Sequence, residues 1–243
     1  MRKKLLSLLQ AALLVLTCFP AMSLAESTYE VTTVSELTEF VENATEGDVV
    51  YLADTFVYGD VALSMPDVNV VIDGNNQTWT GGSIVVTGSG VGSLTIQNLQ
   101  VDGSGLDRRA LVNTAAAGTL RLRNMTFSSC AYGAITLETT DLLNAFTVIE
   151  GTRIYNNNAW NTAPAIWLGP SANLELNYST IEDNYSTGGG YEGGAVSSKS
   201  YAAALNINNS VFMNNINGCV NTGILGGGGS AMAFHYFYGN ITI

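Results

Sequence analysis

The chain has little positive charge, and this scarcity limits the partners that it can bind. Its 243 residues include 9 Lys and Arg against 20 Asp and Glu, so the formal net charge is −11 at pH 7. Nucleic acids and anionic membrane surfaces are bound through clustered Lys and Arg, and the sequence therefore predicts neither as a partner. Calcium binding is not favoured either, because no loop has the closely spaced Asp residues that calcium sites use.

Histidine is also scarce. His235 is the only histidine in the chain, so we expect neither a catalytic triad nor a histidine metal cluster. Its aromatic neighbours favour a packing role instead. The sequence accordingly assigns no cofactor, no cofactor-binding residue and no metal ligand.

A long apolar run occurs only at the N-terminus. Basic residues at positions 2–4 precede a mostly apolar stretch over 5–19, which is typical of a secretory signal peptide covering residues 1–25. The run is short of the ~20 residues that span a bilayer, and a lipid anchor on Cys18 is a minor alternative. We therefore expect residues 26–243 to be secreted or displayed at the cell surface, without a transmembrane segment, and the Lys-rich leader favours a bacterial source.

Five later segments repeat one short pattern. Each has inward-type residues at positions 0, 2 and 7, and the starts are 26, 27, 27 and 31 residues apart. A period of this length indicates a stacked array, and alternation along each strand gives one inward and one outward face. The segments are Leu94–Val101, Leu120–Phe127, Thr147–Ile154, Leu174–Ile181 and Leu205–Phe212.

Two positions of the repeat predict ladders along the stack. Position 7 is apolar throughout and holds Val101, Phe127, Ile154, Ile181 and Phe212. Three residues later stand Cys130, Asn157, Asn184 and Asn215, with Gly103 at the equivalent turn of the first segment. Stacked Asn side chains bond amide to amide along such an axis, so we predict an Asn ladder in preference to plain polar turns.

The same register separates the two cysteines that follow the leader. Cys130 and Cys219 lie three repeats apart, which is ~14 Å at one strand spacing of ~4.8 Å for each coil. A disulfide needs Cα atoms within ~7 Å. We therefore predict two free, mostly buried thiols.

The rest of the chain follows from turn residues and one helical pattern. Residues 26–60 are predicted to form an N-terminal cap, with an amphipathic helix at Val34–Glu42 that Ser35 N-caps and a strand at Val49–Leu52. A cap is needed because an open end leaves apolar surface and unpaired strand edges. Residues 61–243 are predicted to form coils with at least two strands each. The expected second strands are Ala110–Val112, Gly133–Ile135, Ala165–Trp167, Ala195–Val196 and Ala231–Phe234.

These features resemble known families. The stacked segments, the helical cap and Val71-Ile-Asp-Gly74 are similar to the right-handed parallel β-helix of the pectin-lyase-like superfamily. Gly193-Gly-Ala-Val196 and Phe212-Met-Asn-Asn215 resemble the repeat pair of polymorphic outer-membrane proteins and adhesin-like surface proteins. The resemblance implies an all-β, single-stranded, right-handed parallel β-helix with a short N-terminal capping helix. It implies little about activity, because enzymes and binding proteins share this coil.

Glycoside hydrolysis would need two carboxylates, and the outward positions of adjacent coils are the place to find them. Equivalent residues one coil apart lie ~4.8 Å apart, near the ~5 Å that a retaining mechanism requires. At outward positions 1 and 3, no two acidic residues lie directly above each other on adjacent coils. Glu150 and Glu175 make only a diagonal pair, and Arg123 beside Glu150 predicts a cross-strand ion pair. The sequence therefore assigns no catalytic residue.

Basic and aromatic residues give two weaker candidates. After the leader the basic residues are Arg108, Arg109, Arg121, Arg123, Arg153 and Lys199. The first four would make a carboxylate-binding patch if they met, although surface ion pairing is the favoured interpretation. Trp79 would stack on sugar rings if exposed. Trp160, in an Asn-rich loop, is the better candidate for such a contact, while Trp167 is expected in the core.

Two functions therefore stay open. The favoured one is a secreted or cell-surface β-helix with a structural, adhesive or carbohydrate-binding role, whose partner is a polysaccharide or a host or cell-surface ligand. The alternative is a polysaccharide lyase or glycoside hydrolase that acts on acidic polysaccharide. We favour the first because no catalytic set converges. Ile241 and Ile243 fit positions 0 and 2 of another repeat, so we expect the sequence to be a C-terminally truncated fragment.

Overall fold

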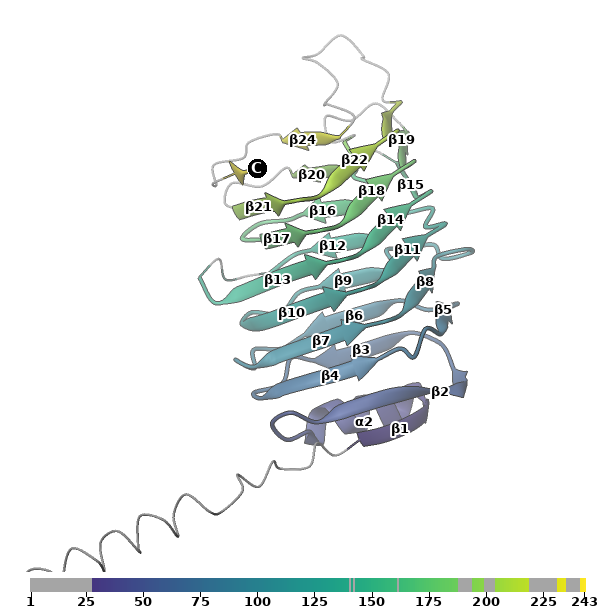
Figure 1. Ribbon diagram of the computed structural model, residues 1–243, viewed down its shortest axis with the longest axis vertical. Helices are drawn as coiled ribbons and strands as arrows, with labels where there is room; N and C mark the ends of the chain where they lie inside the picture. The colour runs from purple at the N-terminus through teal and green to yellow at the C-terminus, as the bar shows by residue number, and fades with distance from the viewer. Residues whose placement is uncertain are drawn as a thin grey trace, which may run out of the picture.

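The computed structural model describes residues 28–139, 141, 143–160, 162–187, 194–198, 204–218, 231–234 and 241–243. They form a parallel β-solenoid of about six turns with one short helix near the N-terminus (Figure 1). The predicted all-β parallel β-helix is thereby confirmed. The predicted leader at residues 1–25, Lys199, Cys219 and His235 lie outside the described residues.

Four sheets run along the solenoid, and we name them A to D. Sheet A has nine described strands in the order β1-β2-β4-β7-β10-β13-β17-β21-β25. Its strands are β1 Thr28–Thr33, β2 Val49–Val57, β4 Asn69–Asp73, β7 Ser93–Gln97, β10 Gly118–Arg123, β13 Ala145–Glu150, β17 Asn173–Asn177, β21 Ala204–Asn208 and β25 Ile241–Thr242.

The other three sheets have shorter strands. Sheet B has seven described strands, which are β3 Val61–Ser64, β6 Ile84–Thr87, β9 Leu111–Asn113, β12 Ile135–Leu137, β16 Ile166–Leu168, β20 Val196–Ser198 and β24 Met232–Phe234. Sheet C has six, which are β5 Thr78–Thr80, β8 Gln100–Asp102, β11 Thr126–Ser128, β14 Arg153–Tyr155, β18 Thr180–Glu182 and β22 Val211–Met213. Sheet D has three, which are β15 Asn158–Trp160, β19 Tyr185–Thr187 and β23 Ile216–Asn217.

The predicted repeat matches the observed register. From β4 onward the described coils run from sheet A through sheet C to sheet B. The coils that begin at β13, β17 and β21 also pass through sheet D, between sheets C and B. Position 0 pairs Leu120 with Leu94 below and with Thr147 above. At position 7, Phe127 pairs with Val101 and Ile154. These residues are buried at 1% exposure or less, so the apolar stack is confirmed.

The bend between sheets A and C repeats at position 4. The residues there all have a positive φ, between 49° and 58°, and are Asn98, Asn124, Gly151, Tyr178 and Asn209. Only glycine and, at lower cost than other residues, asparagine or aspartate adopt this left-handed conformation readily. Four of the five residues are therefore suited to this turn, and Tyr178 adopts the same conformation as the exception.

The N-terminal cap has one more element than the sequence predicted. The helix α2, Val34–Asn43, packs under the first coils with Leu37 and Val41 buried, and the strand β1 precedes it and pairs in parallel with β2. The predicted N-cap Ser35 is wrong. Thr33 caps the helix, because its Oγ1 accepts a hydrogen bond from the Glu36 backbone N–H at 3.2 Å.

The predicted Asn ladder is confirmed and lies inside the solenoid. Asn157 donates from Nδ2 to Asn184 Oδ1 at 2.9 Å, and Asn184 donates likewise to Asn215 at 2.9 Å. Each Oδ1 also accepts the backbone N–H of the ladder residue below it, at 3.1 and 3.2 Å. Asn184 and Asn215 also donate from Nδ2 to the carbonyls of Ile154 and Ile181, respectively. The ladder thus satisfies polar groups that burial would otherwise leave unpaired.

The ladder ends below Asn157 at a smaller residue. Cys130 donates its backbone N–H to Asn157 Oδ1 at 3.0 Å, and its side chain is free of any disulfide and buried. Burial raises the pKa of the Cys130 thiol to about 12. One coil lower, a Cβ on Gly103 would lie 2.4 Å from Cys130 Sγ, so only glycine fits there. The prediction of a free buried thiol is confirmed at Cys130.

The last described strand continues the repeat. Ile241 pairs with Leu205 across β25 and β21, which confirms the expected position 0. Ile241 and Ile243 are 42% and 80% exposed.

Candidate functional site

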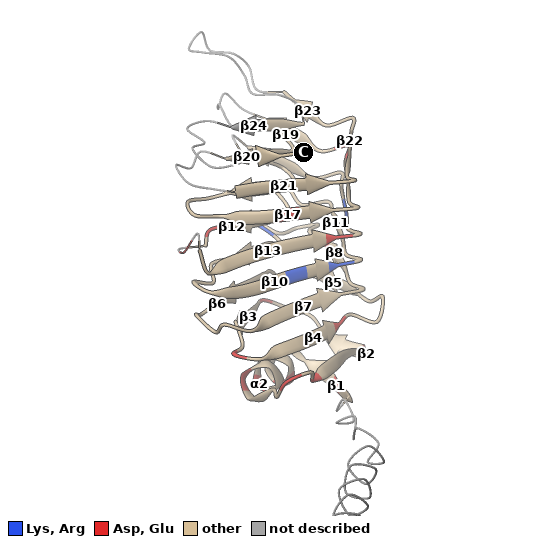
Figure 2. Cartoon of the chain, turned by 60° about the vertical axis from the view of Figure 1, so that its left-hand side comes forward, with Lys and Arg blue, Asp and Glu red and all other residues tan. Residues whose placement is uncertain are grey.

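The outward face of sheet A carries the two columns of residues in which a pair of catalytic carboxylates would be expected. Position 1 runs through Thr95, Arg121, Val148, Glu175 and Asn206, and position 3 runs through Gln97, Arg123, Glu150, Asn177 and Asn208. Figure 2 shows this sheet, with the basic residues of β10 in blue beside the acidic end of β13 in red. The predicted columns are therefore correct, and they hold mixed single charges.

Glu150 and Glu175 do not form a catalytic pair in this geometry. Glu175 faces Val148 on the neighbouring strand, while Glu150 faces Asn177, so the two carboxylates stand in different columns. Arg123 Nε lies 3.2 Å from Glu150 Oε2, which confirms the predicted ion pair. Both side chains are more than 40% exposed, and such a surface pair contributes roughly 0–1 kcal/mol.

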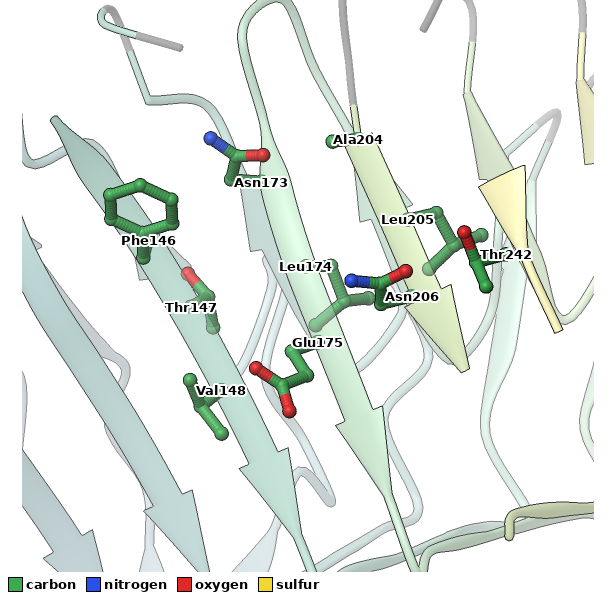
Figure 3. A pocket seen from close by; sticks show the side chains of 10 residues that line it. All are labelled: Phe146, Thr147, Val148, Asn173, Leu174, Glu175, Ala204, Leu205, Asn206 and Thr242. Carbon is green, nitrogen blue, oxygen red and sulfur yellow. The ribbon is translucent and has the colours of Figure 1, made fainter. Parts of the chain in front are cut away.

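Glu175 accepts a hydrogen bond from a neighbouring amide and lines a surface hollow. Asn177 donates from Nδ2 to Glu175 Oε1 at 2.8 Å, and Asn208 donates to Asn177 Oδ1 at 3.0 Å. A surface hollow of about 390 Å³ lies over β13, β17, β21 and β25. Figure 3 shows the Glu175 carboxylate between Val148 and Asn206, with the Phe146 ring toward one end. This hollow was not predicted from the sequence.

The lining of the hollow combines one aromatic ring with polar groups. Phe146 is 44% exposed. Hydrogen-bonding side chains come from Asn173, Asn206 and Thr242, and Glu175 is the single acidic residue among the described lining residues. An aromatic face beside amides and a carboxylate acceptor is the chemistry that binds a polyhydroxylated ligand, because the ring packs on C–H surface and the polar groups exchange hydrogen bonds with hydroxyls.

The four arginines of the hypothesised basic patch do not meet. Arg121 and Arg123 stand on sheet A. Arg108 instead binds Asp60 through Nη2 at 2.5 Å and Ser83 through Nε at 3.0 Å, at the edge of sheet B. The Arg108 guanidinium lowers the pKa of Asp60. A carboxylate-binding patch of all four arginines is therefore excluded.

Arg109 is part of the fold rather than of an exposed patch. It donates from Nη1 to the Ala163 carbonyl and from Nη2 to Thr162 Oγ1, both at 2.7 Å. Burial lowers the pKa of Arg109 to about 10, which leaves it charged at neutral pH. A Cβ on Gly133 would lie 1.9 Å from Arg109 Nη1, so the absence of a side chain at Gly133 makes room for this contact.

A charge cluster on sheet C was not predicted from the sequence. Arg153 Nε and Nη2 both contact Glu182 Oε1, at 2.6 and 2.5 Å, and the guanidinium lies 4.0 Å from the centre of the Tyr155 ring. Thr180 faces Arg153 in the register, so the ion pair is diagonal. The sequence could have indicated this ion pair, because Arg153 and Glu182 occupy repeat positions two residues apart on adjacent coils.

The three tryptophans occupy three different environments. Trp79 is buried at 1% exposure and donates to the Gly82 carbonyl at 3.1 Å, which excludes it as a sugar-binding residue. Trp167 was expected in the core, and this is wrong. It points outward on β16 between the buried residues Ile166 and Leu168 and is half-buried. Trp160 is 69% exposed, as a surface contact would require.

Comparisons with known proteins assign no family to the chain, so it is classified by its fold. No protein-family model matches the chain, and a search of curated proteins finds no match. No helix among the described residues is long and apolar enough to cross a membrane. In the same part of the chain, no three His, Cys, Asp or Glu side chains gather as a metal site would need. The class that the structure defines is the parallel β-solenoid.

Proposed function

We propose that this chain is a secreted or cell-surface β-solenoid that binds carbohydrate, in a structural or adhesive role, through the hollow on sheet A. The signal-peptide pattern at residues 1–25 supports the location. The hollow supports the ligand class, because it places an exposed phenyl ring within reach of amide, hydroxyl and carboxylate groups. That combination in one concave surface is the observation that carries the proposal.

The same hollow favours binding over catalysis. Hydrolysis of a glycosidic bond commonly uses two carboxyl groups on opposite sides of the scissile bond, and the described lining offers only Glu175. The nearest candidate partner, Glu150, is engaged by Arg123 and stands in the other column. A polysaccharide lyase or glycoside hydrolase stays the alternative, with Glu175 as its first residue to test.

A binding and turnover screen tests the proposal. The purified chain is titrated with a panel of uncharged and acidic oligosaccharides, and the products are assayed for unsaturated and reducing ends. We expect saturable binding without turnover, and we expect Phe146→Ala and Glu175→Gln to weaken it by about tenfold or more, or ~1.4 kcal/mol. Leu143→Ala is the matched control, because Leu143 is 78% exposed and does not line the hollow.

Two results would contradict the proposal. Turnover that Glu175→Gln abolishes would replace it with the enzymatic alternative. Binding that survives both hollow variants unchanged would remove the hollow as the site.

A further inference from the structure

Sheet D presents a small aromatic surface that the hollow on sheet A does not include. Trp160 and Tyr185 point outward from β15 and β19 with exposures of 69% and 41%, and Ile216 on β23 is 55% exposed. Tyr185 pairs directly with Asn158 and with Ile216, while Trp160 pairs with Thr187. Trp160 and Tyr185 are therefore diagonal neighbours, which lie within reach of each other across a sheet.

The Asn ladder fixes the start of each strand in this surface. Asn157, Asn184 and Asn215 immediately precede β15, β19 and β23. The first residue of each strand donates its backbone N–H into the coil below: Asn158 to the Cys130 carbonyl at 2.7 Å, Tyr185 to Asn157 at 2.8 Å and Ile216 to Asn184 at 2.8 Å. The outward residues are thus held in place before any ligand arrives, which lowers the cost of binding.

Arg109 fixes the other end of β15. The residue that it binds through Nη2, Thr162, follows Trp160 by two positions, and the Thr162 carbonyl also accepts a hydrogen bond from Ser186 Oγ at 3.1 Å. Thr187 Oγ1 donates to the Ala159 carbonyl at 3.3 Å. The backbone that carries Trp160 is therefore tied down on both sides, although its indole is exposed.

The size of the surface argues against a protein partner. Three strands ~4.8 Å apart with up to three residues each cover about 10 by 10 Å, whereas a stable protein interface buries ~800 Å² on each partner. A surface of that size accommodates one or two sugar rings.

The absence of charged residues from these strands favours an uncharged sugar. None of the residues in β15, β19 and β23 is charged. Aromatic platforms also stack nucleic acid bases, but those sites add a positively charged groove for the backbone. A carboxylated or sulfated sugar would likewise find no cation on these strands. An uncharged sugar fits, with the indole and phenol rings packing on its C–H faces and Asn158 exchanging hydrogen bonds with its hydroxyls.

We propose that Trp160 and Tyr185, held by the Asn ladder, form a second binding site that takes uncharged oligosaccharide. This site stands on residues other than those of the hollow and does not depend on the proposed function of the hollow.

Oligosaccharide titration tests this site. Cellohexaose and mannohexaose are the uncharged probes, oligogalacturonate is the anionic one, and binding is followed by calorimetry on the full chain. We expect an uncharged probe to bind in preference to oligogalacturonate, and we expect Trp160→Ala and Tyr185→Ala each to weaken that binding by about tenfold or more. Trp167→Ala is the matched control, because it removes another outward-facing indole from sheet B, and we expect it to change the affinity less than about twofold.

The outcomes separate this site from the hollow. Weakening by Trp160→Ala and Tyr185→Ala, with Phe146→Ala unchanged for the same probe, supports the second site whether or not the hollow binds. Weakening by Phe146→Ala alone overturns the second site and supports the hollow. Failure of both uncharged probes to bind, or a Trp160→Ala variant that binds like Trp167→Ala, also overturns it. Because Trp160 is exposed, its substitution is expected to leave folding intact, which circular dichroism checks.

Discussion

The turn after sheet C differs between the lower and upper coils of the solenoid. In the lower coils it holds Gly103 and Cys130, and no described strand of sheet D follows either residue. In the upper coils it holds Asn157, Asn184 and Asn215, and each is followed at once by a strand of sheet D. A buried amide that bonds to the coils above and below can order the residue after it, whereas a thiol or a hydrogen atom cannot. One position of the repeat therefore decides where an extra surface is built.

The charge distribution divides the molecule in a similar way. Residues 28–107 include twelve acidic residues and no basic one, whereas residues 108–243 include seven acidic and six basic residues. The acidic residues at the N-terminal end lie along α2 and the first strands (Figure 2). The four ion pairs of the described residues all use arginines from the second part. Two of these pairs reach back to Asp60 and Asp107 in the first part, and the other two lie wholly in the second part, where both candidate sites also lie.

The largest expected effect comes from breaking the ladder at its centre. Asn184→Ala removes four hydrogen bonds and leaves buried groups of Asn157, Asn215 and Ile154 without their partner. We expect a loss of ~3–5 kcal/mol in the free energy of unfolding, because unpaired buried polar groups cost more than a hydrogen bond gains. Chemical denaturation measures it. Asn177→Ala, in the exposed amide pair on sheet A, is the control and should cost ~1 kcal/mol or less.

In the lower coils, we expect a substitution at the turn after sheet C to destabilise the fold by steric overlap instead of by loss of hydrogen bonds. Gly103→Ala places a Cβ 2.4 Å from Cys130 Sγ and 2.8 Å from Cys130 Cα, so backbone has to move. Overpacking of this kind costs ~1–3 kcal/mol. The matched variant is Gly59→Ala, because nothing lies within 4 Å of the added Cβ there. Equal stability of the two variants would show that the lower turn is not tightly packed.

Cys130, in the lower coils, is expected to make the free energy of unfolding depend on pH. Its pKa is raised from 9.0 to about 12 in the folded chain, so between these values the unfolded state has lost a proton that the folded state keeps. Stability therefore falls as the pH rises above 9. Between pH 8 and 10.5 we expect the native chain to lose ~1–2 kcal/mol more than Cys130→Ala does. Denaturation of both chains at the two pH values measures the difference. An equal loss of stability in the two chains would contradict the burial of the thiol.

The sequence predicted the columns that recur in every coil, and it missed the first strand of the cap and the strands of sheet D. The columns at positions 0, 1, 3 and 7 and the Asn ladder follow from a register of side chains that one strand spacing enforces. The strand β1 was missed because Thr28–Thr33 belongs to no repeat, and its pairing with β2 arises only after α2 reverses the chain. Ser35 was preferred to Thr33 as the N-cap because both are good capping residues and only the backbone decides between them.

The candidate sites were harder to predict than the coil. The repeat placed Glu175 outward, but the hollow also needs Phe146 and Ala204 from neighbouring coils, and their side-chain sizes carry no periodic signal. Sheet D was missed because Asn156–Asn158 reads as a turn by composition. The pattern correctly favoured Trp160 as a surface residue. It placed Trp167 in the core because a single apolar residue in a three-residue strand does not reveal which face it occupies.

Amide hydrogen exchange in the native state tests most directly whether the ladder builds sheet D. The rates of the Asn158, Tyr185 and Ile216 amides are compared between the native chain and Asn184→Ala, with the Val112 amide on sheet B of a lower coil as reference. We predict that the substitution speeds exchange at the three sheet D amides far more than at Val112. Equal acceleration at all four amides, or no change at sheet D, would contradict the account.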